Sequence, residues 1–279
     1  MNGDVKSVLL LTLLVSAFWF VAGRAGEGTD QGNAMTSAPV RLKLLRRLPH
    51  STDDYCQGLT WDVDAKGNGF LRESTGRYGQ SKLKTYDPET GEVAQSVSLH
   101  ERFFGEGHVR AGDRIYMLTW QERTCLVFDN QLKQLDEFRY PGEGWGLTFD
   151  GINLVMSDGS DVIRFLETDS FREVRRLKVF YRQNGKKYPL KQINELEWID
   201  GEIWANVYET NYLVRISPTS GEVIQILNCQ SLVPQSLQGN RDFVFNGIAW
   251  DQKNRRLYLT GKCWPIMYEL TFQRVNNEQ

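Results

Sequence analysis

One acidic residue in this sequence has a setting that suits proton transfer. Glu106 comes directly after the segment Phe103-Phe104-Gly105. Burial among aromatic side chains removes water from a carboxylate and raises its pKa toward neutrality, where one group can both accept and donate a proton. Lys262 is a candidate counter-charge that would lower this pKa again, and the sequence alone does not rank the two effects. We therefore expect Glu106 to be a general acid/base catalyst.

Amide and aromatic residues at matching places in the chain could complete a site around this carboxylate. Amides and a lysine can orient a polar group and stabilise charge that develops during a reaction, and aromatic rings can line an apolar binding surface. The candidates for substrate binding are Gln57, Trp120, Trp145, Asn194, Tyr208 and Lys262. A second interpretation stays open for Gln57 and Asn246, which could instead form hydrogen bonds that only tie neighbouring strands together.

These candidates belong to five similar units of the chain. Each unit opens with a polar residue or tryptophan, then a small or acidic residue and an apolar one. The units begin at Gln57, Glu106, Trp145, Asn194 and Asn246, roughly 40 to 50 residues apart. A second short strand is expected in each, over residues 70–73, 114–120, 153–158, 202–208 and 256–262, and third and fourth strands follow in most. Four short strands in each unit, without helical periodicity, are typical of β-propeller blades.

The fifth unit, about residues 243–275, contains only three predicted strands. A strand over residues 40–48, ahead of the first unit, can supply the fourth and close the ring, which removes two exposed sheet edges. The sequence therefore predicts an all-β fold, a five-bladed β-propeller closed by an N-terminal strand in the last blade, with a sandwich or barrel as the alternative. Because the first strand of each blade lines the central channel, the five unit starts should meet at one end of it.

Some other residues in this pattern have less specific interpretations. Glu73 and Asp158 lie near the ends of predicted second strands, where acids commonly stabilise turns or tie blades together, so we leave both outside the candidate site. The basic stretch over residues 182–191 lies between the third and fourth units and is predicted to be a solvated loop.

The N-terminus has the pattern of an export signal. Lys6 precedes an apolar run over residues 8–21, which is shorter than the roughly 20 residues that a transmembrane helix needs. This favours a signal peptide over residues 1–25, with an uncleaved signal anchor as the alternative because bulky aromatic residues lie near the expected cleavage site. Residues 26–39 are predicted to be a flexible linker and residues 40–279 the catalytic propeller. We expect an extracytoplasmic protein, periplasmic or secreted, attached to a membrane only through such an anchor.

Composition narrows the partners and cofactors. The 279 residues include 33 Lys and Arg against 35 Asp and Glu, a formal net charge of −2, which gives no electrostatic reason to expect nucleic acid. Four cysteines (Cys56, Cys125, Cys229 and Cys263) leave the disulfide pairing open. Because they are widely spaced and only three histidines are present, a zinc site is not expected. We expect no metal, no cofactor and a monomer.

The motifs taken in order resemble those of one enzyme family. The matching motifs include Tyr55-Cys56-Gln57-Gly58-Leu59, Phe104-Gly105-Glu106-Gly107, Glu143-Gly144-Trp145-Gly146-Leu147-Thr148, Asn194-Glu195-Leu196-Glu197, Asn246-Gly247-Ile248-Ala249 and Thr260-Gly261-Lys262. Each motif is weak by itself, but the ordered series is specific. It is similar to the plant-type glutaminyl cyclases, a family that includes the papaya latex enzyme and bacterial relatives.

The resemblance implies a five-bladed propeller with glutaminyl-peptide cyclotransferase activity and no catalytic metal. Such an enzyme converts the N-terminal glutamine of peptides or proteins to pyroglutamate and releases ammonia. By position, Glu106 matches the family's acid/base glutamate, and the matching binding residues are Gln57, Phe104, Trp120, Trp145, Asn194 and Lys262. Tyr208 stands where tryptophan is usual and Tyr55 where phenylalanine is common, which implies altered substrate preference more than lost activity. His108, in a position that is usually aliphatic, has no explanation from the sequence.

Other functions remain compatible with these residues. A metal-dependent propeller hydrolase or lactonase could bind Ca²⁺ through oxygen atoms of Glu106, Asn194 and Asn246. An exported propeller could also be a non-catalytic binding scaffold, because a fold does not fix a function. In the cyclase mechanism, we expect Glu106 to accept a proton from the α-ammonium group or the attacking amine first and then to deliver one to the leaving nitrogen.

Overall fold

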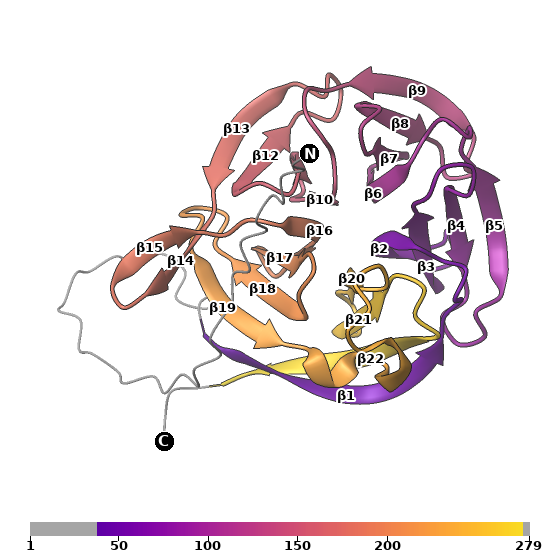
Figure 1. The fold of residues 1–279 in the computed structure, drawn as a ribbon. Coiled ribbons are helices and arrows are strands. Elements are labelled where there is room, and N and C mark those ends of the chain that lie inside the picture. Colours follow the sequence, from indigo (N-terminus) through magenta and orange to yellow (C-terminus); the bar gives the residue numbers. More distant parts are fainter. Residues whose placement is uncertain (1–37, 276–279) are drawn as a thin grey trace, which may run out of the picture. The chain divides into compact units, whose positions relative to one another are not determined.

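The computed structural model describes residues 38–275, which contain five four-stranded antiparallel sheets arranged in a ring (Figure 1). The first strand of each sheet lies nearest the centre of the ring. The predicted all-β, five-bladed propeller is therefore confirmed. Within residues 38–275, no helix has the length and apolar character needed to span a membrane. The expected signal sequence over residues 1–25 and most of the expected linker over residues 26–39 lie outside the described residues.

The first four blades each take their strands consecutively from the chain. Blade 1 contains β2 (Cys56–Val63), β3 (Gly69–Thr75), β4 (Lys82–Tyr86) and β5 (Val93–Ser98). Blade 2 contains β6 (Gly105–Ala111), β7 (Arg114–Thr119), β8 (Thr124–Phe128) and β9 (Gln134–Arg139). Blade 3 contains β10 (Leu147–Phe149), β11 (Leu154–Met156), β12 (Val162–Leu166) and β13 (Glu173–Lys178). Blade 4 contains β16 (Ile193–Ile199), β17 (Glu202–Val207), β18 (Tyr212–Ile216) and β19 (Val223–Asn228).

Blade 5 joins the two ends of the described chain. Its strands are β20 (Phe245–Asp251), β21 (Arg256–Gly261), β22 (Ile266–Arg274) and β1 (Val40–Pro49). The N-terminal strand β1 pairs antiparallel with β22 along its whole length, so it closes the ring as predicted. Two short 3-10 helices, η1 (Gln230–Leu232) and η2 (Gln235–Leu237), lie between blades 4 and 5 in the chain.

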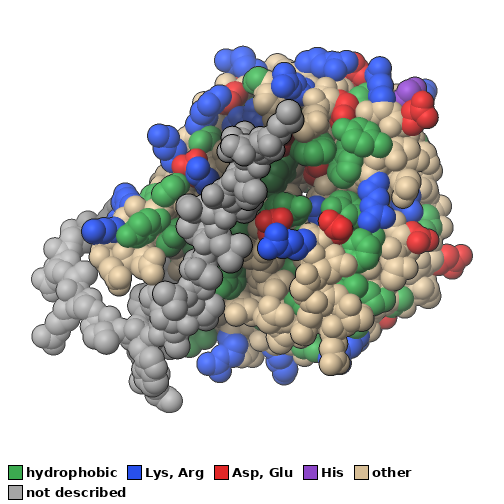
Figure 2. Space-filling model, in the orientation of Figure 1, with side chains coloured by type: hydrophobic (Ala, Val, Ile, Leu, Met, Phe, Trp, Pro, Cys, Tyr) green, Lys and Arg blue, Asp and Glu red, His purple; other side chains and the backbone are tan. Residues whose placement is uncertain are grey.

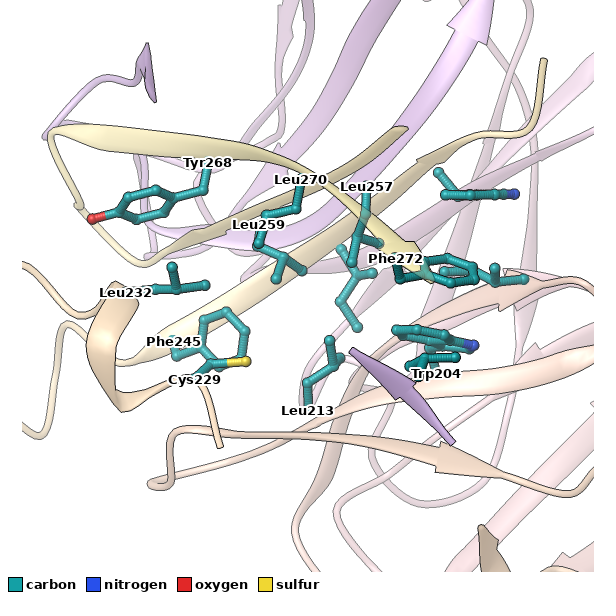
Figure 3. Close-up of a cluster of buried hydrophobic side chains, with 14 of the residues drawn as sticks. Trp204, Leu213, Cys229, Leu232, Phe245, Leu257, Leu259, Tyr268, Leu270 and Phe272 are labelled. Carbon is teal, nitrogen blue, oxygen red and sulfur yellow. The ribbon is translucent and has the colours of Figure 1, made fainter. Parts of the chain in front are cut away.

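Apolar side chains hold neighbouring blades together. Among residues 38–275, five clusters of buried apolar side chains each join two adjacent blades. Figure 3 shows the cluster between blades 4 and 5, which includes Trp204, Leu213, Phe245, Leu257 and Phe272. Burying one such side chain contributes roughly 1.5–3 kcal/mol, so the interfaces between blades are a main source of stability for the ring.

A break in strand pairing marks the start of each unit. In four blades, a β-bulge interrupts the pairing of the first strand with the second, at Gln57, Glu106, Asn194 and Asn246. In blade 3 the first strand begins only after Trp145 and Gly146. A bulged residue leaves the regular ladder and can re-aim its side chain, so every blade presents one irregular position at the centre of the ring.

Hydrogen bonds at and beside these irregular positions join the blades around the whole ring, with at least one between each pair of adjacent blades. The five bonds run from Ser74 Oγ to Glu106 O (2.7 Å), Gly107 N to Trp145 O (2.7 Å), Ser157 Oγ to Asn194 O (2.6 Å), Gly247 N to Asn206 Oδ1 (2.9 Å) and Asn246 Nδ2 to Cys56 O (3.0 Å). The blades approach so closely here that a Cβ on Gly146 would lie 2.0 Å from Asn194 O. These contacts fix the backbone positions of the candidate residues, and Asn246 ties blades 5 and 1 together.

Residues 182–191 do not form the predicted solvated loop. An exposed two-stranded hairpin, β14 (Phe180–Gln183) and β15 (Lys186–Pro189), projects from the ring between blades 3 and 4 (Figure 1). Its turn residues Asn184 and Gly185 both have positive φ, 50° and 76°, as a tight two-residue hairpin turn requires. The Asn-Gly dipeptide is the sequence signal that predicts this hairpin.

The four cysteines are buried and free in the structure. No disulfide joins Cys56 to Cys263, which was one of the pairings left open. Burial raises the pKa of all four thiols, which is typical of unreactive cysteines that serve as small apolar residues.

Candidate active site

Four buried polar side chains form the centre of the candidate site. Gln57, Glu106 and Asn194 lie at the bulges, and Lys262 directly follows β21; their exposed fractions are 4%, 4%, 3% and 3%. The side chain of Gln57 is hydrogen-bonded to Glu106. Within residues 38–275, Oε1 of Gln57 and Oδ1 of Asn194 are buried without a hydrogen-bond partner. Such unpaired acceptors cost about 1–3 kcal/mol each, so they are well suited to receive donors from a bound ligand.

Burial decides the charge state of Glu106. Removal from water raises the pKa of its carboxyl group well above the usual range, while Lys262 and the hydrogen bond with Gln57 oppose this shift without outweighing it. The same burial lowers the pKa of Lys262 to about 8. Burial therefore has a larger effect on the pKa of Glu106 than Lys262 has, a ranking that the sequence left open. The Glu106 carboxyl group stays protonated well above the pH at which an ordinary glutamate ionises.

Lys262 is directed toward aromatic rings. Its Nζ lies 4.6 Å from the ring centroid of Tyr55 and 5.1 Å from that of Tyr208. Tyr208 in turn packs edge-on against Trp145, with ring centroids 5.6 Å apart. Tyr208 thus contacts the Lys262 ammonium on one side and the Trp145 ring on the other, so a tyrosine in place of the tryptophan that the resemblance implies keeps an aromatic ring at this position.

The aromatic contacts continue from Tyr55 to Phe104 and Trp120. Phe104 packs against Tyr55 at a centroid distance of 6.2 Å and against Trp120 at 5.6 Å. The indole N–H groups of Trp120 and Trp145 both donate to Oε2 of Glu143, over 2.7 Å and 2.9 Å. Tyr55, Phe104, Trp120, Trp145 and Tyr208, which we call the aromatic circuit, are therefore linked end to end through Lys262 and Glu143. All five aromatic side chains are half-buried, and the buried carboxyl group of Glu106 lies close enough to influence the pKa of Tyr55 and Tyr208.

The structure thus brings Glu106 together with Gln57 and Lys262 and links six of the predicted binding residues by contacts: Gln57, Phe104, Trp120, Trp145, Tyr208 and Lys262. The seventh, Asn194, lies at the bulge of blade 4, where its backbone oxygen accepts from Ser157 Oγ. Glu73 does not reach the site, because β3 continues past it to Thr75. Gly76 follows that strand, and a Cβ on it would lie 2.4 Å from the Phe104 ring and 3.1 Å from Cγ of Gln57. The missing side chain at Gly76 makes room for both residues.

His108 has a structural role. Its Nδ1 lies 2.9 Å from Ser74 Oγ and its Nε2 lies 3.1 Å from Thr60 Oγ1. Burial lowers the pKa of this imidazole to about 3, so it is neutral and links two blades through hydrogen bonds. The sequence position that had no explanation is therefore part of the polar packing between blades 1 and 2.

A second group of buried charges lies where β1 meets blade 1. His50, Asp54, Glu73 and Lys84, which we call the closure cluster, include the one set of potential metal ligands close enough together among residues 38–275, namely His50, Asp54 and Glu73. However, Lys84 Nζ is hydrogen-bonded to Asp54 and lies 3.4 Å from Glu73. Lys82 also contacts Asp54, over 2.9 Å, so two ammonium groups already balance the two carboxylates and the cluster does not fit a divalent cation.

Sequence reasoning missed two acids beside the site. Glu143 was part of a matching motif but was given no role, although it binds both indoles. Glu122 accepts hydrogen bonds from Tyr78 Oη (2.8 Å) and from the backbone N of Phe104 (3.2 Å). Both acids raise the pKa of Glu106 through their negative charge.

On the face shown in Figure 2, acidic and basic side chains are interspersed, so neither sign dominates.

The fold and site define a class of protein: a five-bladed propeller whose centre contains a buried glutamate, a buried lysine and a group of aromatic side chains. The sequence profile of the family described as "Glutamine cyclotransferase" matches residues 15–272, so the chain belongs to this family. An Arabidopsis thaliana protein named glutaminyl-peptide cyclotransferase is 31% identical over 271 residues, 96% of this chain and 82% of that protein. The crystal structure of Myxococcus xanthus glutaminyl cyclase is similar with a TM-score of 0.75 and 32% identity, covering 84% of this chain and 97% of that one. The predicted family and enzyme class are confirmed.

Proposed function

We propose that this chain converts the N-terminal glutamine of peptides and proteins to pyroglutamate and releases ammonia, with Glu106 as the proton-transfer residue. The observation that carries the proposal is the setting of Glu106. Its carboxyl group is buried, hydrogen-bonded to Gln57 and influenced by Lys262, and it lies close enough to two members of the aromatic circuit, Tyr55 and Tyr208, to raise their pKa values. Membership of the glutamine cyclotransferase family supports the same reaction over the hydrolase and the scaffold.

The chemistry needs a folded-back substrate and the transfer of one proton. The α-amine nitrogen forms a bond to the γ-amide carbon, and the bond from that carbon to the amide nitrogen breaks. Since both groups belong to one residue, the enzyme chiefly selects the reactive conformer and moves protons. Trp120 and Trp145 are the residues that we assign to holding the glutamine side chain and excluding water, whose attack would yield glutamate.

The raised pKa of Glu106 supports an order of proton transfer opposite to the one expected from the sequence. A protonated Glu106 first donates its proton to the leaving amide nitrogen and then takes one from the attacking nitrogen, so it ends the cycle protonated. We assign Gln57, Asn194 and Lys262 to orienting the amide and stabilising negative charge on its oxygen in the transition state. The unpaired acceptor oxygens of Gln57 and Asn194 can receive the N–H groups of the substrate.

The reaction is tested by incubating the full chain with a peptide that begins with glutamine. We expect a mass loss equal to one ammonia and a product that aminopeptidases no longer degrade. The same peptide with an acetylated α-amine has no nucleophile and should stay unchanged. Activity should survive dialysis against a chelator, since no step uses a metal. Binding without loss of ammonia, or activity that the chelator abolishes, would overturn the proposal.

We also propose that the enzyme works outside the cytoplasm, as a monomer. The support is the apolar run over residues 8–21, which has the pattern of an export signal. A site made by residues of one chain supports a monomer, because no second copy is needed to complete it. Fractionation of producing cells and size-exclusion chromatography with light scattering test these two points.

A further inference from the structure

We propose that Glu143 is a positioning residue that holds Trp120 and Trp145 at a fixed spacing across the boundary between blades 2 and 3. This inference rests on the proposed function, since the two indoles are assigned there to holding the substrate. Trp120 follows β7 of blade 2, and Trp145 precedes β10 of blade 3. One oxygen of Glu143, Oε2, accepts both indole N–H groups, over 2.7 Å and 2.9 Å.

The aromatic circuit is incomplete without this carboxylate. Tyr208 contacts Trp145, and Phe104 contacts Trp120, but among residues 38–275 the two tryptophan rings form no ring-to-ring contact with each other. Glu143 therefore supplies the one connection between the ends of the circuit. An indole that loses its N–H acceptor is free to rotate about its side-chain torsions, so removal of Glu143 should loosen both rings together.

The backbone around Glu143 is fixed to both blades. Arg164 of blade 3 donates to Pro141 O and to Glu143 O, each over 2.9 Å. On the other side, the Tyr140 hydroxyl accepts from Thr119 N over 3.2 Å and donates to Thr119 O, at the end of β7 directly before Trp120. The backbone that carries this carboxylate is thus held by the same two blades whose tryptophans the carboxylate binds, which is what a positioning residue requires.

Glu143 also carries a charge that reaches the reacting group. Its side chain is half-buried, and its negative charge raises the pKa of Glu106. The hydrogen-bond acceptor and the charge can be removed separately. Glu143→Gln keeps an acceptor oxygen and loses the charge, whereas Glu143→Leu loses both.

Glu122 provides a matched control. It is another half-buried acid whose charge raises the pKa of Glu106, but its hydrogen bonds go to Tyr78 and the backbone of Phe104, and not to an indole. Near-ultraviolet circular dichroism reports the packing of the indoles without requiring turnover. We expect Glu143→Leu to change the indole bands, and we expect Glu143→Gln, Glu122→Gln and Glu122→Leu to preserve them.

Kinetics with a glutamine peptide complete the test. For Glu143→Leu we expect kcat/KM to fall by about 10²-fold, because small misplacements of a substrate-holding group have effects of this size. Glu143→Gln should recover most of this loss and should move the alkaline limb of the pH profile to lower pH, because Glu106 then ionises more easily. Wild-type indole bands and kinetics in Glu143→Leu would overturn the inference, as would equal changes of the bands in Glu122→Leu. If the wild-type chain forms no pyroglutamate, the proposed function fails. The circular dichroism still tests whether Glu143 positions the two indoles.

Discussion

Glu73 and Glu106 are glutamates on neighbouring blades with similar burial, 0% and 4% exposed, and with opposite charge states. Burial opposes ionisation of both. At Glu73, His50 and Lys84 together outweigh burial and lower the pKa to about 2. At Glu106, Lys262 and Gln57 do not outweigh it, and the pKa rises well above the usual range. Depth in the protein is therefore not what separates the structural acid Glu73 from Glu106, the proposed proton-transfer residue.

The difference lies in where the cations are directed. In the closure cluster, Lys84 lies 3.4 Å from Glu73, and His50 Nε2 lies 3.1 Å from the other carboxylate oxygen. In the candidate active site, the ammonium of Lys262 faces the rings of Tyr55 and Tyr208. A carboxylate with two cationic partners stays ionised and holds the ring closed, whereas one whose cation is shared with aromatic rings keeps its proton and can transfer it.

The largest effect is expected from Glu106→Gln, which keeps the shape of the side chain and removes its ability to transfer a proton. We expect kcat to fall by about 10²–10⁴-fold, the usual contribution of a positioned acid/base group. The melting temperature at neutral pH should not fall, because the group removed is a buried acid without a close cation. Initial rates with a glutamine peptide and a thermal scan check this; turnover close to that of the wild type would remove Glu106 from the mechanism.

The reverse pattern is expected for Glu73→Gln. This variant leaves Lys84 and His50 without the carboxylate that contacts both of them, and breaking a buried ion pair costs about 3–5 kcal/mol. The contribution of Glu73 is present above the pKa of an unfolded glutamate and is lost as pH falls toward about 2. Urea unfolding at neutral pH should show the loss in free energy of unfolding, and unchanged stability would mean that the closure cluster does not stabilise the ring.

The fold could be predicted from the sequence because it repeats. Five similar units and one unpaired N-terminal strand leave few ways to bury their sheet edges, and the structure agrees with the predicted closure by β1. The hairpin β14–β15 was missed because it lies outside the repeat, where only the Asn184-Gly185 turn signals it. The hairpin was therefore predictable from the residues of its turn, but not from the repeat pattern.

The residues of the candidate site could be proposed from the sequence, but their charge states could not. The unit starts identified Gln57, Glu106 and Asn194, because equivalent positions must meet at the axis. The charge state of Glu106 depends on whether Lys262 contacts it or faces Tyr55 and Tyr208, which is a matter of side-chain direction. The proposed role of Glu143 could not be predicted for a related reason. It depends on the directions of two indole side chains that belong to different blades.

The smallest effect expected is a difference in the pH dependence of stability, and it tests the charge state of Glu106 directly. The raised pKa means that the folded protein binds a proton which the unfolded chain releases above its ordinary pKa, so this group destabilises the wild type increasingly as pH rises toward the folded pKa. Glu106→Gln lacks the effect. Its free energy of unfolding relative to the wild type should therefore increase with pH above about 4.5, by at most about 1.4 kcal/mol per pH unit.

Urea unfolding of both proteins at several pH values between mildly acidic and neutral measures this difference. Other buried acids, such as Glu195 and Glu197, also have raised pKa values, but they are present in both proteins and cancel in the comparison. Parallel stability curves would mean that Glu106 is ionised in the folded protein. The order of transfer would then begin with removal of a proton from the amine, and the contrast with Glu73 would rest on geometry alone.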